Sequence, residues 1–292
     1  MAEDDFGLIS YKIFRPIAKK YAKLFFKELK NDLRRANMRL TIEEYFSEFL
    51  LVESVVMPVF LIASFLLISI ISNDIIISII MSLIFSLIIG VGVLTFFYLN
   101  PSNIVQERAK KIDNALHFAT LYMATLATTG TPPFLIFEVL SDFKEFGEVS
   151  KVALRITEDV QLFGYDLPES LARHAEIVPS NNLSELLWGI RATILSGGDL
   201  NSFLHEKSKT FTNMFRRRLE EYVQTMSLFM EMYITVVIVG TVLVIVLSTI
   251  MGMMGGMQGQ VQLLQTLFIG LGVPFVTTAF IIVFKTISPT AV

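Results

Sequence analysis

Long apolar runs separated by charged segments dominate the pattern of hydrophobic and polar positions along the chain. Twenty residues without a charge separate Glu53 from Asp74, 32 more run from Ile75 to Gln106, and another 53 run from Met232 to Phe284. A membrane-spanning helix needs about 20 consecutive apolar residues, so the first two runs each fit one span. The third run fits two spans, divided by the Gly- and Met-rich stretch 252–259. The pattern predicts four membrane-spanning helices in two hairpins, at residues 54–72, 75–99, 232–251 and 263–284.

The segment between the two hairpins has the pattern of helices and lacks the alternation of strands. Gly and Pro residues cut it into pieces of helical length, for example at Gly130, Gly164 and the pair Gly197-Gly198. Asp166 and Asp199 stand where N-caps are expected. We therefore expect a bundle of six short helices, of which the last continues into the third span. The other five are predicted at residues 105–129, 131–146, 148–163, 166–177 and 183–194.

The N-terminal arm is also predicted to be mostly helical. Thr41-Ile42-Glu43-Glu44 resembles an N-cap with acidic residues in the first turn, and it predicts a helix that leads into the first span. Phe25, Phe26, Leu29 and Leu33 form an apolar stripe expected to pack on the membrane face or the central domain. The predicted fold is an all-α membrane protein with two transmembrane hairpins flanking a cytoplasmic six-helix bundle. Its parts are an arm (1–53), a first hairpin (54–99), a cytoplasmic domain (100–227) and a second hairpin (228–292).

Basic residues predict the orientation in the membrane. Ten of the 24 Lys and Arg residues lie in residues 1–50, thirteen lie in 99–227, and Lys285 follows the last span. Lys and Arg accumulate on the cytoplasmic side of membrane proteins. We therefore expect a multi-pass protein of the cytoplasmic (inner) membrane, with both termini and the central domain in the cytoplasm. The formal net charge is −3, whereas nucleic-acid-binding proteins are usually strongly basic, so nucleic-acid binding is not expected. No cleavable signal peptide is expected either.

Residues that carry catalysis or bind metal are sparse. The chain has no Cys, and His117, His174 and His205 lack the spacing of a metal site. Gly197-Gly198-Asp199 follows a helix and lacks the Lys of a phosphate-binding loop, so it is interpreted as a pair of helix caps. We expect no catalytic residue, no cofactor, no metal and no enzymatic activity. A soft-metal site at the four Met residues of 251–257 is a minor alternative to a flexible turn.

A few charged residues are candidates for contacts with partners. Glu231 begins the otherwise uncharged third span, and an ionisable group inside hydrocarbon usually has a partner or a wet cavity. It contacts another subunit, forms a hydrophilic pocket for an incoming protein, or extends to water at the cytoplasmic interface; the sequence leaves these alternatives open. The basic residues Arg216, Arg217, Arg218, Lys110 and Lys111 either bind a partner protein or anionic lipid, or anchor the adjacent spans.

Several stretches of the central segment resemble one known family. They are Leu126-Ala-Thr-Thr-Gly-Thr-Pro-Pro-Phe, Phe163-Gly-Tyr-Asp-Leu-Pro-Glu-Ser-Leu171 and Leu195-Ser-Gly-Gly-Asp-Leu-Asn-Ser-Phe-Leu204. In order, spacing and position between two hairpins they are similar to the F-domain of type II secretion and type IV pilus platform proteins. Glu231-Met-Tyr-Ile-Thr-Val-Val and Met251-Gly-Met-Met-Gly-Gly resemble the archaeal branch of that family. The resemblance covers roughly residues 105–285, and residues 33–45 of the arm are also similar to the family.

The resemblance implies a membrane platform for the assembly of a type IV-like pilus. In such a system a hexameric secretion ATPase moves the platform, which inserts pilin subunits into the filament. The resemblance thus implies a pilin as the incoming protein at Glu231, and the ATPase as the partner protein of the basic residues at 216–218 and 110–111. The presence of one F-domain, where many platform proteins have two, resembles the tight-adherence (Tad) arrangement. This implies a homodimer or a pair with a paralogous F-domain subunit, together with contacts to membrane lipids.

Two other functions remain compatible with the sequence. A small transporter or channel subunit would place polar residues inside the spans, and Ser64, Ser78, Ser82 and Ser86 are such residues, although no charge lies in mid-span. A membrane adaptor is the other alternative. Solute flux in proteoliposomes would favour a transporter, and co-purification with a secretion ATPase would favour a platform.

Overall fold

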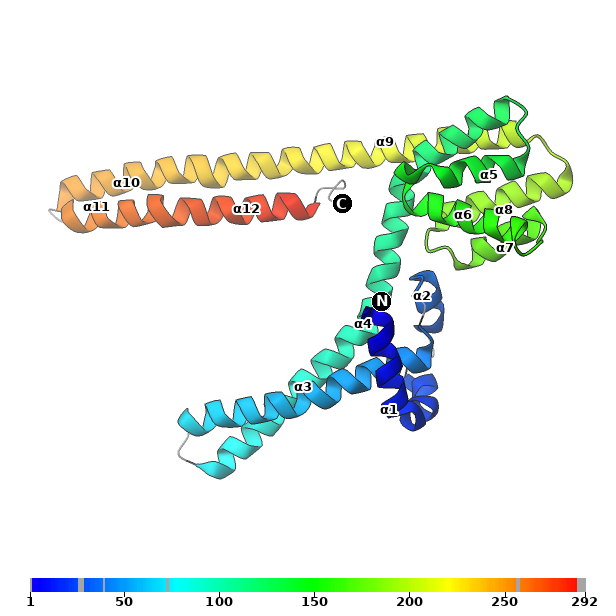
Figure 1. Cartoon of the computed structure of the whole chain (residues 1–292). Helices are drawn as coiled ribbons and strands as arrows, with labels where there is room; N and C mark the ends of the chain where they lie inside the picture. Colours follow the sequence, from blue (N-terminus) through cyan, green and yellow to red (C-terminus); the bar gives the residue numbers. More distant parts are fainter. Residues whose placement is uncertain (1, 26–28, 39, 72–73, 256–257, 288–292) are drawn as a thin grey trace. The chain divides into compact units, whose positions relative to one another are not determined.

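A computed structural model describes residues 2–25, 29–38, 40–71, 74–255 and 258–287 (Figure 1). Every regular element in these ranges is helical, and no strand occurs among them. Four stretches are long and apolar enough to cross a membrane: Ile42–Ile70, Ile75–Thr128, Leu200–Met254 and Gln265–Phe284. The prediction of an all-α protein with four spans is thus confirmed. The chain divides into two compact units, Met1–Phe211 and Thr212–Val292, which are described separately.

The first hairpin consists of α3 (Ile42–Ile71) packed against α4 (Ile75–Thr128). One side of α4 is lined every four residues by small buried residues, which allow the two backbones to approach closely. The hydroxyl of Ser86 on this side donates to the carbonyl of Met57 at 3.2 Å. Large apolar side chains of both helices, such as Leu67 and Ile76, point outward and are exposed, as expected of a surface that faces lipid. The small buried residues are Ser78, Ser82, Ser86 and Gly90.

These serines give no support to a transporter. Ser78 donates to the carbonyl of Asp74, and Ser82 donates to the carbonyl of Ile79, at 3.1 and 2.9 Å. Ser64 makes the same kind of bond, to the carbonyl of Leu61 at 3.2 Å. A hydroxyl that donates to a carbonyl in the preceding turn of its own helix has its hydrogen bond satisfied there and does not indicate a polar pathway.

The helix α4 continues from the membrane into the central domain without a break, whereas the sequence pattern predicted a separate helix starting at residue 105. Pro101 lies inside it and is buried. A proline has no N–H, so it leaves the carbonyl four residues earlier without its helical partner. That carbonyl belongs to Phe97, and the hydroxyl of Tyr45 on α3 donates to it at 2.8 Å. The missing bond is replaced by a tertiary one, and the helix persists.

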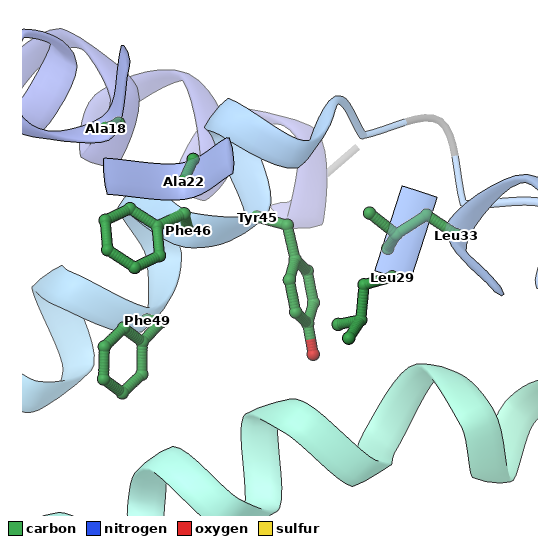
Figure 2. Packing of buried hydrophobic residues seen from close by; sticks show 7 residues of the cluster. All are labelled: Ala18, Ala22, Leu29, Leu33, Tyr45, Phe46 and Phe49. Carbon is green, nitrogen blue, oxygen red and sulfur yellow. The ribbon is translucent and has the colours of Figure 1, made fainter. Parts of the chain in front are cut away.

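The arm packs on the end of this hairpin that lies away from its turn. It contains α1 (Ala2–Phe25) and the short α2 (Leu29–Arg35), and α1 lies along α3. Leu29 and Leu33 are buried in an apolar cluster with residues of α1 and α3 (Figure 2). They therefore pack inside the arm; the side chain of Phe25 and residue Phe26 lie outside the described part. The cluster comprises Ala18, Ala22, Leu29, Leu33, Tyr45, Phe46 and Phe49.

The predicted cap at the start of α3 is confirmed by a reciprocal pair of hydrogen bonds. The backbone N–H of Thr41 donates to the carboxylate of Glu44 at 2.7 Å, and the N–H of Glu44 donates to the hydroxyl of Thr41 at 3.3 Å. This capping box satisfies two N–H groups that a helix start leaves without partners. The carboxylate of Glu44 is thereby bonded to the backbone at the start of its own helix.

The central helices lie close to their predicted positions. They are α5 (Pro133–Asp142), α6 (Glu148–Gln161), α7 (Leu167–Ile177) and α8 (Asn181–Ser196), with a short 3-10 turn η1 (Lys144–Phe146). The part of α4 that follows Pro101 and the start of α9 (Leu200–Tyr233) complete this region. Its core is formed by apolar residues that are almost fully buried, including Ile112, Leu116, Ile136, Ile156, Leu171, Leu186, Ile190 and Leu204.

The Gly-Tyr-Asp-Leu-Pro motif forms the turn from α6 to α7. Gly164 has a φ of +71°, a left-handed conformation that a side chain would strain. The Asp159 carboxylate accepts bonds from the hydroxyl of Ser170 at 3.3 Å and from Nε2 of His174 at 3.2 Å. Burial lowers the pKa of His174 and outweighs the opposing attraction of Asp159, so the imidazole is largely neutral at pH 7. The motif is therefore a structural link between two helices.

Gly189 marks a close contact between α8 and α9. A Cβ atom placed there would lie 2.3 Å from Cζ of the Phe203 ring, much closer than two carbon atoms can approach. We expect Gly189→Ala to destabilise the protein by about 1 kcal/mol, because overpacking costs about 1–3 kcal/mol and alanine regains about 1 kcal/mol of helix propensity. The measurement is the unfolding midpoint in detergent, followed by the fluorescence of Trp188. Adding Phe203→Leu should restore part of the loss, and a double variant no more stable than Gly189→Ala would contradict this packing.

The second unit is a hairpin formed by the end of α9 and the elements that follow. The backbone continues from α9 through a π-helical segment η2 (Ile234–Val239) into α10 (Gly240–Gly255), and returns through α11 (Gln258–Leu267), the π-helical η3 (Phe268–Gly272) and α12 (Val273–Ile287). Ring contacts join Tyr233 to Phe280 at 5.5 Å and Phe229 to Phe284 at 6.0 Å. The turn is shorter than the sequence suggested, since helix extends to Gly255 and resumes at Gln258. Residues 256–257 lie outside the described part.

Candidate partner-binding surface

An apolar groove is present on the surface of the part of α4 that follows Pro101. Phe118 and Leu121 project outward with 59% and 49% of their surface exposed, which is unusual for such residues on a soluble surface. Beside them lies a cavity of about 470 Å³, closed on one side by Phe146 of η1. We call this the α4 groove; it is lined by Ala115, Phe118, Leu121, Tyr122, Thr125, Glu145 and Phe146.

The walls of the α4 groove are held by aromatic packing. The ring of Tyr122 lies 4.9 Å from that of Phe143 and 5.8 Å from that of Phe146. The opposite face of α4 supplies Leu116 and Met123 to the core, so the helix is fixed with Phe118 and Leu121 directed outward. Large exposed apolar surface on a domain outside the membrane is typical of a protein-binding site.

The sequence-predicted basic pair lies close to this groove on the same helix. Lys110 and Lys111 are both exposed, and Lys111 precedes Ala115 of the groove by one helical turn. The ammonium of Lys111 forms an ion pair with Glu107 at 2.8 Å. Exposed pairs of this kind contribute little to stability, so Lys110 and Lys111 remain available to a partner.

Comparison with known proteins identifies this region. Residues 119–248 match the family model of type II secretion system (T2SS), protein F. Residues 119–248 carry a T2SS F domain. The match begins inside the α4 groove, covers α5 to α9, and extends into α10 of the second hairpin. The predicted resemblance is confirmed.

A curated relative matches part of the chain, and its function is not known. Over 142 residues the chain is 29% identical to the uncharacterized protein MJ1286 of Methanocaldococcus jannaschii. The aligned part covers 49% of this chain and 24% of MJ1286, so the chain spans about a quarter of that relative. No solved structure matches the chain significantly.

The remaining predicted contact residues lie inside the F-domain match, on α9. Arg216, Arg217, Arg218 and Glu231 are all exposed. Arg218 is thirteen residues before Glu231, about 20 Å along a continuous helix. They belong to the second unit, whereas Lys110 and Lys111 belong to the first, so the two groups are considered as separate surfaces. No metal-binding group of three or more His, Cys, Asp or Glu side chains occurs in the described part of the chain.

Two charged residues that precede the F-domain match have roles that the sequence analysis missed. Glu53, taken only as the boundary of the first span, projects from α3 towards Gly90 of α4, where a Cβ atom would lie 2.6 Å from its Oε1. Its Oε2 is buried without a hydrogen-bond partner in the described part of the chain. An unbonded carboxylate oxygen within a membrane hairpin is costly, which makes Glu53 a better candidate for a functional acid than its position in the sequence suggested.

Arg108 is the second charged residue whose role the sequence analysis missed. Its Nε and Nη2 donate to the Glu148 carboxylate of α6 at 2.9 and 2.7 Å, and its Nη1 donates to the carbonyl of Arg35 at the end of α2 at 2.5 Å. Only 14% of the Arg108 side chain is exposed. The sequence analysis counted this residue only among the thirteen basic residues of 99–227 that predict the orientation, whereas its side chain ties the arm to the start of α6. The sequence could not indicate this role, because Glu148 lies 40 residues away and only the fold brings it next to Arg108.

Proposed function

We propose that the protein is a membrane platform for the assembly of a type IV-like, Tad-like pilus, which couples a cytoplasmic secretion ATPase to the insertion of pilin subunits. The observation that carries the proposal is the T2SS F domain combined with four apolar helices long enough to span a membrane. Proteins with T2SS F domains are membrane platform components of secretion and pilus systems. The chain itself contributes no catalytic step.

In this proposal the chain is a multi-pass protein of the cytoplasmic membrane with both termini in the cytoplasm. The support is the distribution of basic residues: Arg216, Arg217 and Arg218 precede the third span, and Lys110 and Lys111 follow the second. Labelling a single Cys introduced near residue 110 with a membrane-impermeant maleimide should fail in intact cells and succeed after lysis, since the natural chain has no Cys.

We assign the α4 groove to a second F-domain chain, either another copy or a paralogue. Phe118 and Leu121 would be covered in that contact, which removes the cost of their exposure to water. The exposed arginines at 216–218 are proposed to face the ATPase, and Glu231 to face the pilin or a neighbouring subunit.

A photo-cross-linking experiment tests the assignment of the groove. With p-benzoylphenylalanine at Phe118, irradiation of native membranes should cross-link an F-domain chain, identified by mass spectrometry. The matched control is the same probe at Phe163, which is 69% exposed but lies outside the groove at the end of α6. Equal cross-linking from both positions, or none from Phe118, would contradict the assignment.

The platform function itself is tested by partner identification and by a break in α9. A P-loop secretion ATPase and a pilin should co-purify with the chain from cross-linked native membranes. A flexible Gly/Ser insertion after Arg218 should abolish filaments while expression stays normal, because it interrupts the helix that enters the third span. Normal filaments from that variant would rule out transmission through α9, and solute flux in proteoliposomes without a bound ATPase would favour a transporter.

A further inference from the structure

A second cavity lies in the arm, away from the F domain. It has a volume of about 510 Å³ and opens between α2 and the start of α3. Leu33, Met38, Leu40 and Ile42 form an apolar floor, and these residues also pack against the buried cluster of the arm. The volume and the apolar floor are those of a site for a hydrocarbon chain.

The rim of this arm cavity carries two cations that are free to bind a ligand. Lys30 and Arg34 line it and are exposed, and the side chain of neither forms a hydrogen bond or ion pair within the described part of the chain. The two acidic residues of the rim are occupied: Glu44 closes the capping box of α3, and Glu43 accepts a bond from the hydroxyl of Tyr11 at 3.3 Å. The carboxylates of Glu43 and Glu44 are thus directed at donors of the protein, whereas the side chains of Lys30 and Arg34 are left to pair with an anion.

The cavity lies at the level where the apolar surface of the first hairpin ends. Ile42, in its floor, is three residues before Tyr45, or about one helical turn. Tyr45 bonds the carbonyl of Phe97 on α4, and at that height Phe96 and Leu99 are largely exposed. Exposed apolar and aromatic residues at the end of a span mark the interface between hydrocarbon and headgroups. A lipid in that leaflet can reach the cavity without leaving the bilayer.

We propose that the arm cavity binds one anionic phospholipid. Its phosphate pairs with Lys30 and Arg34, and the upper part of an acyl or isoprenoid chain lies on the floor of Leu33, Met38 and Ile42. A phosphate close to two basic side chains is favoured by charge, and the chain by the burial of apolar surface. The site goes beyond the proposed platform function and requires only that the protein resides in a membrane.

Native mass spectrometry of the delipidated full-length chain in detergent tests the site. Phosphatidylglycerol is titrated against phosphatidylcholine with the natural protein, with the variant Lys30→Gln/Arg34→Gln, and with the control Lys12→Gln/Lys19→Gln. The control removes two exposed positive charges from α1, outside the cavity. Each basic residue near a membrane surface contributes about a fivefold preference for anionic lipid. We therefore expect phosphatidylglycerol to bind about 30-fold more weakly to the double variant and unchanged to the control.

Each alternative result is decisive. Loss of lipid in the cavity variant alone supports the site, as does a loss of about fivefold in each of the single variants Lys30→Gln and Arg34→Gln. Equal loss in the control shows that only the general charge of the arm attracts lipid, and overturns the proposal. Equal binding of both lipids also overturns it. Displacement of the lipid by soluble glycerol phosphate indicates a site for polar anions, and displacement by an apolar peptide indicates a protein-binding groove; both results overturn the proposal. None of these measurements depends on the secretion ATPase, so the platform function stands or fails separately.

Discussion

Replacing Tyr45 by Phe should destabilise the protein by about 2 kcal/mol, although the change removes a single oxygen atom. The hydroxyl donates at 2.8 Å to the carbonyl of Phe97, which Pro101 has deprived of its helical partner. A buried carbonyl without a hydrogen bond costs about 1–3 kcal/mol. The measurement is the midpoint of unfolding in detergent, by heat or by increasing the fraction of dodecyl sulfate. The natural chain and the variant should otherwise have the same helical content.

A second substitution separates this explanation from a general loss of packing at Tyr45. In Pro101→Ala the new N–H can donate to the Phe97 carbonyl, as in an ordinary helix. The cost of Tyr45→Phe should then fall to a fraction of its value in the natural background. A double-mutant cycle in which the two changes are additive would show that Tyr45 and Pro101 are not linked through this carbonyl.

The same pair shows where the sequence analysis reached its limit. A proline in a polar segment after an apolar run usually indicates that a helix ends, and a new helix was predicted from residue 105. The helix continues because Tyr45, 52 residues before Phe97, supplies the missing donor. Such a bond depends on how α3 lies against α4, which no local pattern reveals.

Local features were predicted much better. The four spans follow from long stretches without charge, because hydrocarbon excludes charged side chains whatever the tertiary contacts. The cap formed by Thr41 and Glu44 and the left-handed Gly197 at the end of α8 are confirmed, since each depends only on residues within one turn. The F domain was likewise predicted from cap and turn motifs in a given order, and these are local signals.

The candidate surfaces were harder to predict from the sequence. Phe118 and Leu121 share one face of α4, Leu116 and Met123 share the opposite face, and either pair is compatible with a buried helical stripe. Only the packing of α5 and α6 on one side of α4 determines that the first two are exposed and the last two buried. The predicted sites were chosen by charge alone. The arm cavity shows why charge is insufficient, because Lys30 and Arg34 differ from other basic residues by the apolar floor beside them.

Arg108 should produce the largest effect of a single substitution outside the membrane. Arg108→Ala leaves the Glu148 carboxylate, 13% exposed, without its principal cation and the Arg35 carbonyl without a donor. Removing one partner of a largely buried ion pair costs about 3–5 kcal/mol, and the remaining Lys151, bonded to Glu148 at 2.6 Å, offsets part of this. We expect a loss of about 3 kcal/mol. Arg108→Lys should lose about half as much, because one ammonium cannot hold two acceptors in the geometry of a guanidinium.

The dependence of stability on pH gives an independent test of this ion pair. Burial raises the pKa of Glu148, but hydrogen bonds from Lys151 and Arg108 outweigh it and lower the pKa below the ordinary value of 4.5. A lowered pKa in the folded state adds stability that is present above the unfolded value and is lost as the pH falls through the folded one. The natural protein should therefore lose stability below about pH 4.5, and the loss should be smaller in Arg108→Ala. A variant with the same acid dependence as the natural protein would show that Arg108 does not hold the Glu148 carboxylate.

Amide hydrogen exchange distinguishes a tie between the arm and α6 from a general contribution to stability. Since Arg108 bonds the last carbonyl of α2, its loss should speed exchange in Leu29–Arg35 more than in α8, which it does not contact. Glu148→Gln is the matched control, because it weakens the ion pair but leaves the bond to Arg35 in place. Exchange in α2 should then rise in Arg108→Ala and much less in Glu148→Gln. A uniform rise over α2 and α8 in both variants would mean that Arg108 stabilises the domain as a whole and does not hold the arm.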